Sequence, residues 1–187
     1  MKILAISDRP PREKIGAILE RSPVDLICTL GDLQQSELSG FESMTNIPKL
    51  GVYGNHDSGM YFEPLGITNM HLKIFEFNGL TFGGFEGCVR YKNDPYAKMY
   101  TQEEAVEMLK DFPRVDVMLV HCPPYGINDE PDEVAHQGYR ALRTYLEEKK
   151  PRYLLHGHTY PTEQTMITRL GDTEIIYVYQ DKLIELQ

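Results

Sequence analysis

The sequence predicts an α/β fold in a single domain over residues 1–187, with parallel strands first and antiparallel strands later. Short apolar runs alternate with segments of helical periodicity, which is typical of parallel strands joined by helices. An Asn78-Gly79 turn between two apolar runs predicts a hairpin. No repeat and no shift in composition divides the chain, so we expect one core.

The N-terminal segment predicts a strand–helix–strand unit. Residues 2–6 and 24–30 are apolar runs of strand length, and residues 12–21 between them carry apolar side chains at helical spacing. Asp8 and Asp32 come just after the two runs. Because parallel strands end at the same edge of a sheet, we expect these two carboxylates to be near neighbours.

The middle of the chain predicts a shift to antiparallel pairing. Residues 33–46 are weakly patterned and precede a strand that ends at Gly54. The predicted hairpin pairs residues 70–77 with 80–84. The glycine-rich stretch 83–87 lacks the spacing of a phosphate loop, so we expect a flexible loop there.

The second half predicts two more helices and further strands. The capping-box pattern that begins at Thr101 predicts a helix over 102–111, and amphipathic spacing predicts another over 137–149. Apolar runs predict strands over 115–120 and 153–155. The last segment predicts a β meander whose runs cover 163–170, 173–180 and 183–186.

Composition narrows the class of protein. The formal charge of -9 disfavours binding to long nucleic acid, which needs many phosphate-neutralising cations. No apolar stretch suits a signal peptide or a membrane span, so we expect a cytoplasmic protein with no membrane partner. Cys28, Cys88 and Cys122 lack zinc-type spacing and fit free thiols in a reducing compartment.

Polar residues follow five separate apolar runs, at the edge where open α/β sheets bind ligands. The most concentrated of these stretches is Gly54-Asn55-His56-Asp57. The strand-end residues together are Asp8, Asp32, Asn55, His121 and His158. Any one of them alone suits an ordinary turn or cap. Together they form an oxygen and nitrogen set suited to manganese, iron, zinc or nickel, and poorly suited to calcium.

In order and spacing, these residues resemble the blocks of the calcineurin-like metallophosphoesterases. The matching blocks are Asp8, Gly31-Asp32, Gly54-Asn55-His56-Asp57, His121 and Gly157-His158. The likeness is closer to small, single-domain members with a His-X-Pro-Pro-X-Gly block, here residues 121–126. The resemblance implies a four-layer αββα sandwich, two mixed sheets flanked by helices, with a site for one or two metal ions at the sheet edges.

The resemblance also implies roles for the matching residues. It makes Asp32 the carboxylate that bridges two metals, manganese being the first choice. Asn55, His121 and His158 would complete one metal site, and Asp8 would belong to the other. It assigns His56 to the phosphate and the leaving oxygen, with Asp57 orienting it. A metal-activated hydroxide would then attack phosphorus.

Two imidazoles of the family pattern are missing. Pro10 and Tyr160 stand where the pattern has histidine, and both losses fall on the metal site that contains Asp8. We expect that second site to be weak, filled only with substrate, or rebuilt from other residues or water. His136, His156 and Tyr160 are the candidates, although packed or hydrogen-bonded roles suit each of them as well.

Two arginines are candidates for phosphate contacts. A guanidinium can grip two phosphoryl oxygens at once, and Arg9 and Arg90 follow predicted strands near the candidate site. A solvated surface role fits either one equally. The acidic run 129–133 lacks the spacing and the glycine of a calcium loop, so we interpret it as a solvated face.

The sequence thus favours a metal-dependent hydrolase of small, nucleotide-like phosphodiesters or phosphomonoesters, with one metal site intact and the other depleted. A nuclease acting on DNA ends is a second enzymatic possibility, disfavoured by the acidic charge. The alternative from another class is a protein-binding scaffold that kept the fold and lost turnover. Retention of His56 favours the enzyme, because a scaffold has no need of a leaving-group acid. A homo-oligomer is left open.

Overall fold

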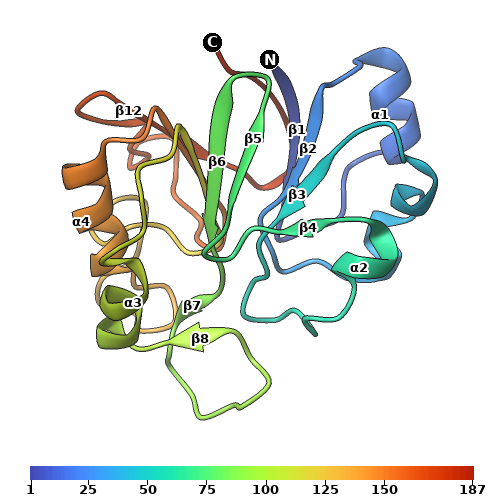
Figure 1. Ribbon diagram of the computed structural model, residues 1–187. Coiled ribbons are helices and arrows are strands. Elements are labelled where there is room, and N and C mark those ends of the chain that lie inside the picture. Colours follow the sequence, from blue (N-terminus) through green and yellow to red (C-terminus); the bar gives the residue numbers. More distant parts are fainter.

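Two β-sheets form the middle of the molecule in a computed structural model that describes residues 1–187 (Figure 1). The five-stranded sheet has the order β13 (Gln180–Glu185), β1 (Lys2–Ser7), β2 (Leu26–Thr29), β3 (Lys49–Gly51) and β4 (Thr68–Asn69). The six-stranded sheet has the order β11 (Arg169–Leu170), β12 (Thr173–Tyr177), β10 (Tyr153–His156), β9 (Val117–Val120), β6 (Leu80–Phe85) and β5 (Ile74–Phe77). A small separate ribbon pairs β7 (Cys88–Val89) with β8 (Met99–Tyr100).

Helices cover the outer faces of both sheets (Figure 1). On the five-stranded sheet these are α1 (Ile15–Arg21) and α2 (Phe62–Leu65), with short 3-10 turns at Gln35–Leu38 and Phe41–Ser43. On the six-stranded sheet they are α3 (Gln102–Leu109) and α4 (Arg140–Lys149). The order helix, sheet, sheet, helix confirms the four-layer αββα sandwich.

Alternation along β1 explains how the layers pack. Ile3 and Ala5 join the apolar cluster between the two sheets, together with residues of the six-stranded sheet such as Leu119. Leu4 and Ile6 face the opposite way and join the cluster beneath α1 and α2. Successive side chains of a strand point to opposite faces. A wholly apolar strand is therefore buried on both sides, as parallel strands usually are.

Both sheets are mixed, and their parallel strands carry the candidate site residues. In the first sheet β1, β2 and β3 are parallel, and β13 runs antiparallel beside β1. In the second sheet β6, β9, β10 and β12 are parallel. The hairpin of β5 and β6 turns at Asn78 (φ 49°) and Gly79 (φ 77°), which confirms the predicted primed turn.

Two helices start later than the periodicity predicted. Before α1, the backbone N–H of Arg12 donates to Asp181 on β13 at 2.8 Å, which holds the chain in an extended path. Before α4, Tyr139 exchanges backbone hydrogen bonds with the loop at Pro123 and Tyr125. In both places tertiary contacts outweigh local helical periodicity. The capping box at Thr101 is present as predicted.

Two other predictions are wrong. The C-terminal strands do not form a single meander: β11 and β12 pair as an antiparallel hairpin, as predicted, but β12 also pairs with β10 in one sheet, whereas β13 pairs with β1 in the other. Gly83 and Gly84 are not a flexible loop but lie inside β6. A Cβ atom on Gly83 would lie 2.9 Å from the Phe112 ring, and one on Gly84 would lie 2.7 Å from Val52. The glycines there allow close packing rather than motion.

Two further observations concern membrane-spanning helices and the cysteines. No helix combines the length and the apolar character that crossing a membrane requires. The three cysteines are free, as predicted from their spacing, and all three are buried.

Candidate metal centre

The carboxyl ends of both sheets meet at one place in the molecule. The N–H of Asp8 donates to the Gly31 carbonyl at 3.0 Å, which joins the ends of β1 and β2. The N–H of Gly157 donates to the His121 carbonyl at 3.0 Å, which joins the ends of β9 and β10. The loops that follow these strands carry the predicted site residues, so the sheet topology alone brings them close together.

Two loops touch through their backbones, and glycine makes this possible. A Cβ atom on Gly31 would lie 2.2 Å from the Gly54 nitrogen, and one on Gly54 would lie 2.5 Å from the Asp32 nitrogen. Gly31 also has a φ of 93°, which side-chain-bearing residues rarely adopt. The close approach places Asp32 beside Asn55.

Asp57 ties these loops together. Its buried carboxylate accepts hydrogen bonds from the N–H groups of Asp32 (2.9 Å), Leu33 (2.9 Å) and Gly54 (2.6 Å), and from the Tyr61 hydroxyl (3.0 Å). Burial raises the pKa of Asp57 to about 6, against the effect of these donors. The family resemblance implies that Asp57 orients His56, but its hydrogen bonds instead fix the backbone of the site.

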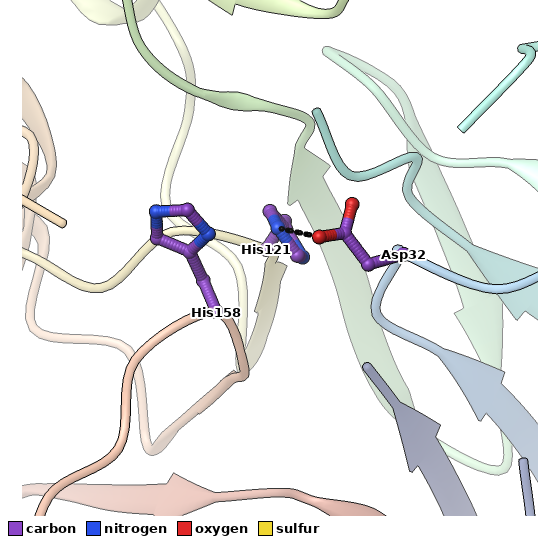
Figure 2. Close-up of side chains that lie close together, drawn as sticks. All are labelled: Asp32, His121 and His158. Atoms are coloured by element: carbon purple, nitrogen blue, oxygen red, sulfur yellow. Dashed lines mark ion pairs between the residues drawn. The ribbon is translucent and has the colours of Figure 1, made fainter. Parts of the chain in front are cut away.

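Asp32, His121 and His158 form a cluster at the meeting point (Figure 2). One possible ligand atom from each residue lies within 4.8 Å of those of the other two. Nε2 of His121 lies 3.5 Å from the Asp32 carboxylate. Asn55 adds an oxygen, because its side-chain Oδ1 lies 3.1 Å from the same Nε2.

Backbone carbonyls orient both imidazoles. His121 donates from Nδ1 to the Leu30 carbonyl at 2.7 Å, and His158 donates from Nε2 to the Ala135 carbonyl at 2.7 Å. Each ring therefore presents its other nitrogen to the cluster. Metal-binding histidines are usually oriented by a hydrogen bond of this kind.

The electrostatics of the cluster favour a positive charge at its centre. Burial opposes protonation of His121, but Asp32 outweighs it and raises the pKa of His121 to about 9. The pKa of Asp32 is lowered in turn, because the attraction of His121 outweighs its burial. Burial and the neighbouring His121 lower the pKa of His158 to about 3, so its second ring nitrogen keeps a free lone pair.

Asp8 holds the backbone of His158 through hydrogen bonds. Both of its carboxylate oxygens accept the His158 N–H, at 3.1 and 3.0 Å, and the Ser7 hydroxyl donates to one of them at 2.5 Å. Burial raises the pKa of Asp8. Asp8 (φ 63°), Asp32 (φ 55°) and His158 (φ 70°) all adopt the left-handed conformation. Such strain costs about 1–3 kcal/mol a residue and is concentrated at functional sites.

A polar cavity of about 340 Å³ opens beside Asp8 and Asp32, and His56, Arg9 and Tyr160 line its other walls. The His56 N–H donates to Asp32 at 2.8 Å, which leaves its exposed side chain to the cavity. Arg9 is exposed and donates to the Tyr179 hydroxyl at 3.3 Å. Burial and the nearby Asp8 raise the pKa of Tyr160, which disfavours a phenolate ligand.

The remaining predicted residues lie in different surroundings. Arg90 pairs with Glu104 at 2.8 Å. His156 is fully buried, with its ring nitrogens 2.9 Å from the Asn128 amide and 3.1 Å from the Gly157 carbonyl. His136 packs against the His158 ring, with centroids 5.5 Å apart. None of these three lines the cavity beside Asp32.

Sequence reasoning missed the groups that hold the cluster in place. Leu30 and Ala135 act through backbone carbonyls, and nothing in a side chain marks such a role. Ser7 gave a usable signal, because it is a buried polar residue that follows four buried apolar residues of its strand.

The residues present fit a divalent cation. The cluster offers one carboxylate, two oriented imidazole nitrogens and the Asn55 oxygen, a donor set suited to manganese, iron, zinc or nickel. The carboxylate of Asp32, which raises the pKa of His121, would favour a cation at the same place. The Asn55 amide nitrogen is buried without a partner, as happens where a side chain serves a ligand rather than the fold.

Comparisons with known proteins agree on the fold. A family model described as a calcineurin-like phosphoesterase superfamily domain matches residues 1–177. One solved crystal structure shares 16% identity, covers 94% of this chain and 89% of its own, and has a TM-score of 0.65. The protein TT1561 of Thermus thermophilus shares 18% identity over 94% of this chain and 88% of its own, with a TM-score of 0.59.

A hypothetical protein, also from Thermus thermophilus, shares 20% identity over 96% of this chain and 75% of its own, with a TM-score of 0.51. At these identities the solved structures show the fold alone. No curated protein sequence matches the chain. The family model matches residues 1–177, and the fold and the Asp32, His121 and His158 cluster both suit that family. This chain therefore belongs to the calcineurin-like phosphoesterase superfamily.

Proposed function

We propose that this protein hydrolyses small, nucleotide-like phosphodiesters or phosphomonoesters with the help of a divalent transition metal. Manganese is the first choice, with iron, zinc and nickel as alternatives. One observation carries the proposal: Asp32, which forms a cluster with His121 and His158, also lines a polar cavity together with His56 and Arg9. A metal bound there would supply Lewis acidity and lower the pKa of water.

The chain's own residues would bind and orient the ester. Arg9 can hold two phosphoryl oxygens through its planar guanidinium. His56 can donate a proton to the leaving oxygen, because its backbone is fixed on Asp32 while its ring stays exposed in the cavity. The two buried imidazoles stay in place through hydrogen bonds to backbone carbonyls, which do not involve substrate.

We infer that a single ion occupies the site tightly. The oxygens of Asp8 already accept hydrogen bonds from Ser7 and His158, and the raised pKa of Tyr160 disfavours its phenolate. Because two imidazoles of the family pattern are missing, Asp8 and Tyr160 would make a poor second metal site. A second ion would then bind weakly, or only together with substrate.

The experiment combines metal analysis with hydrolysis. Protein loaded with Mn²⁺ and dialysed is assayed for metal content and for hydrolysis of bis(p-nitrophenyl) phosphate, using wild type, Asn55→Ala and the control Arg12→Ala. Arg12 is exposed and its side chain lies 3.7 Å from Asp181, outside the cavity. We expect about one Mn²⁺ per wild-type chain and a loss of activity in Asn55→Ala of about 100-fold or more.

Two results would contradict the proposal. Retention of full activity by Asn55→Ala would place the chemistry elsewhere. Metal binding without hydrolysis of any diester or monoester tried would favour the protein-binding scaffold.

A further inference from the structure

Tyr160 forms the wall between two cavities. The first is the polar cavity beside Asp32, and the second, of about 420 Å³, is lined by Tyr160 together with Asn128, Glu130 and Ile167, among others. Tyr160 is 55% exposed, which is unusual for an aromatic residue next to a buried cluster. A ligand that spans both cavities must therefore pass over this side chain.

The ring is held in place by its neighbours. It makes near-perpendicular contacts with the rings of His136, at 6.1 Å and 80°, and Tyr179, at 5.9 Å and 76°. His136 is supported by Glu130, whose carboxylate lies 3.2 Å from its Nδ1, and Tyr179 by the Arg9 hydrogen bond. Perpendicular ring pairs are a favourable geometry. Tyr160 is thus a fixed and exposed aromatic surface.

The two cavities differ in the cations that offset their carboxylates. The first is lined by Asp8, Asp32 and Glu37, but it also contains Arg9 and adjoins the proposed metal, so with the metal bound it suits a phosphate. The second is lined by the carboxylates of Asp129 and Glu130, and its lining includes no lysine or arginine. A second phosphate placed there would be repelled. A neutral ring, by contrast, could stack on Tyr160 and contact Ile167.

We propose that Tyr160 and the second cavity bind the ring of the substrate's organic group. The substrate class is then a phosphate ester with a single phosphate and an aromatic ring, as in a nucleoside or an aryl ester. This inference rests on the proposed phosphoesterase function and refines its specificity. Tyr160 acts as a specificity-determining residue, in a position where the family pattern has a metal-binding imidazole.

Binding of non-hydrolysable phosphonates tests the inference without turnover. Benzylphosphonate and methylphosphonate are titrated calorimetrically into Mn²⁺-loaded wild type, Tyr160→Ala and Tyr160→Phe. Tyr96→Ala is the matched control, because Tyr96 is 87% exposed on the loop between β7 and β8. Stacking on an aromatic side chain contributes a factor of about 5 or more in affinity.

We expect wild type, Tyr160→Phe and Tyr96→Ala to prefer benzylphosphonate by about 5-fold or more. Tyr160→Ala should lose that preference and still bind methylphosphonate normally. In hydrolysis, Tyr160→Ala should raise KM for an aryl diester by about 5-fold and leave kcat within about 2-fold.

Equal affinity of wild type for the two phosphonates would overturn the inference and leave the phosphoesterase function standing. An equal loss of affinity for both phosphonates in Tyr160→Ala would also overturn the inference, since Tyr160 would then contact the phosphate or the metal. A wild type that binds neither phosphonate and hydrolyses no ester would instead overturn the proposed function itself.

Discussion

The imidazole of His121 on the loop after β9 donates from Nδ1 to the carbonyl of Leu30 after β2, at 2.7 Å. This bond joins the two sheets and at the same time aims Nε2 at Asp32. His121→Ala should therefore weaken Mn²⁺ binding by about 100-fold or more, because it removes a ligand. It should also destabilise the metal-free protein by about 1–3 kcal/mol, because the Leu30 carbonyl loses its partner. Metal titration and denaturation in chelator measure the two effects, and an unchanged Mn²⁺ affinity would rule out His121 as a ligand.

His56→Ala should separate catalysis from metal binding. The side chain of His56 lies in the cavity, and only its backbone N–H contacts Asp32. We expect kcat to fall by about 100- to 10,000-fold, the usual contribution of a general acid, with Mn²⁺ content unchanged. Steady-state kinetics and elemental analysis check this. Loss of the metal in His56→Ala would show that the ring is a ligand rather than an acid.

Arg9→Ala should raise KM for phosphate esters more than it lowers kcat. Arg9 is the arginine that lines the cavity, and its guanidinium already lies beside Tyr179. We expect an increase in KM of about 10-fold, because a charge-assisted hydrogen bond to phosphate contributes about 1.5–3 kcal/mol in a protected site and less in an exposed one. Arg12→Ala is the matched control and should leave KM unchanged. Equal effects of the two substitutions would indicate only a general effect of charge.

Asp57→Asn should destabilise the fold and the site together. The carboxylate accepts three backbone N–H groups and a hydroxyl, and an amide would turn one of its two acceptor atoms into a donor. We expect a loss of about 2–4 kcal/mol in the free energy of unfolding. Asp25→Asn is a fair control, because Asp25 is exposed and accepts a single N–H from Lys2 at 2.7 Å. Comparable losses in both variants would argue against a special role for Asp57.

His156 should make stability depend on pH. Burial lowers its pKa to about 4, so the folded protein keeps this ring neutral while the unfolded chain protonates it near pH 6.5. Stability from this residue is present above pH 6.5 and is lost as the pH falls toward 4, at up to about 1.4 kcal/mol per pH unit. Denaturant titrations in chelator from pH 7.5 to 4.5 measure it. His156→Gln should show a flatter dependence, and an equal slope would contradict the assignment.

The sequence predicted which candidate site residues lie close together better than it predicted the ends of the elements. Asp32, Asn55, His121 and His158 each follow an apolar strand, and the rule that parallel strands end at one edge is enough to gather them. The start of α1 and the pairing of β13 depend instead on contacts between distant segments, as Arg12 with Asp181 shows. Local periodicity carries no information about such contacts. The same holds for the backbone carbonyls of Leu30 and Ala135, which a residue of any type at those positions would provide.

The pairing of β13 with β1 has a consequence for how this protein is made. Residues 2–7 leave the ribosome well before residues 180–185, which form the strand that completes their hydrogen bonding. Throughout synthesis, the edge of β1 that β13 will cover therefore exposes unpaired N–H and C=O groups, which invite pairing with another chain. Contacts between the two ends of a chain also form slowly. A nascent chain released before residue 180 would lack this protection, so we expect C-terminal truncations to aggregate rather than to yield a weaker enzyme.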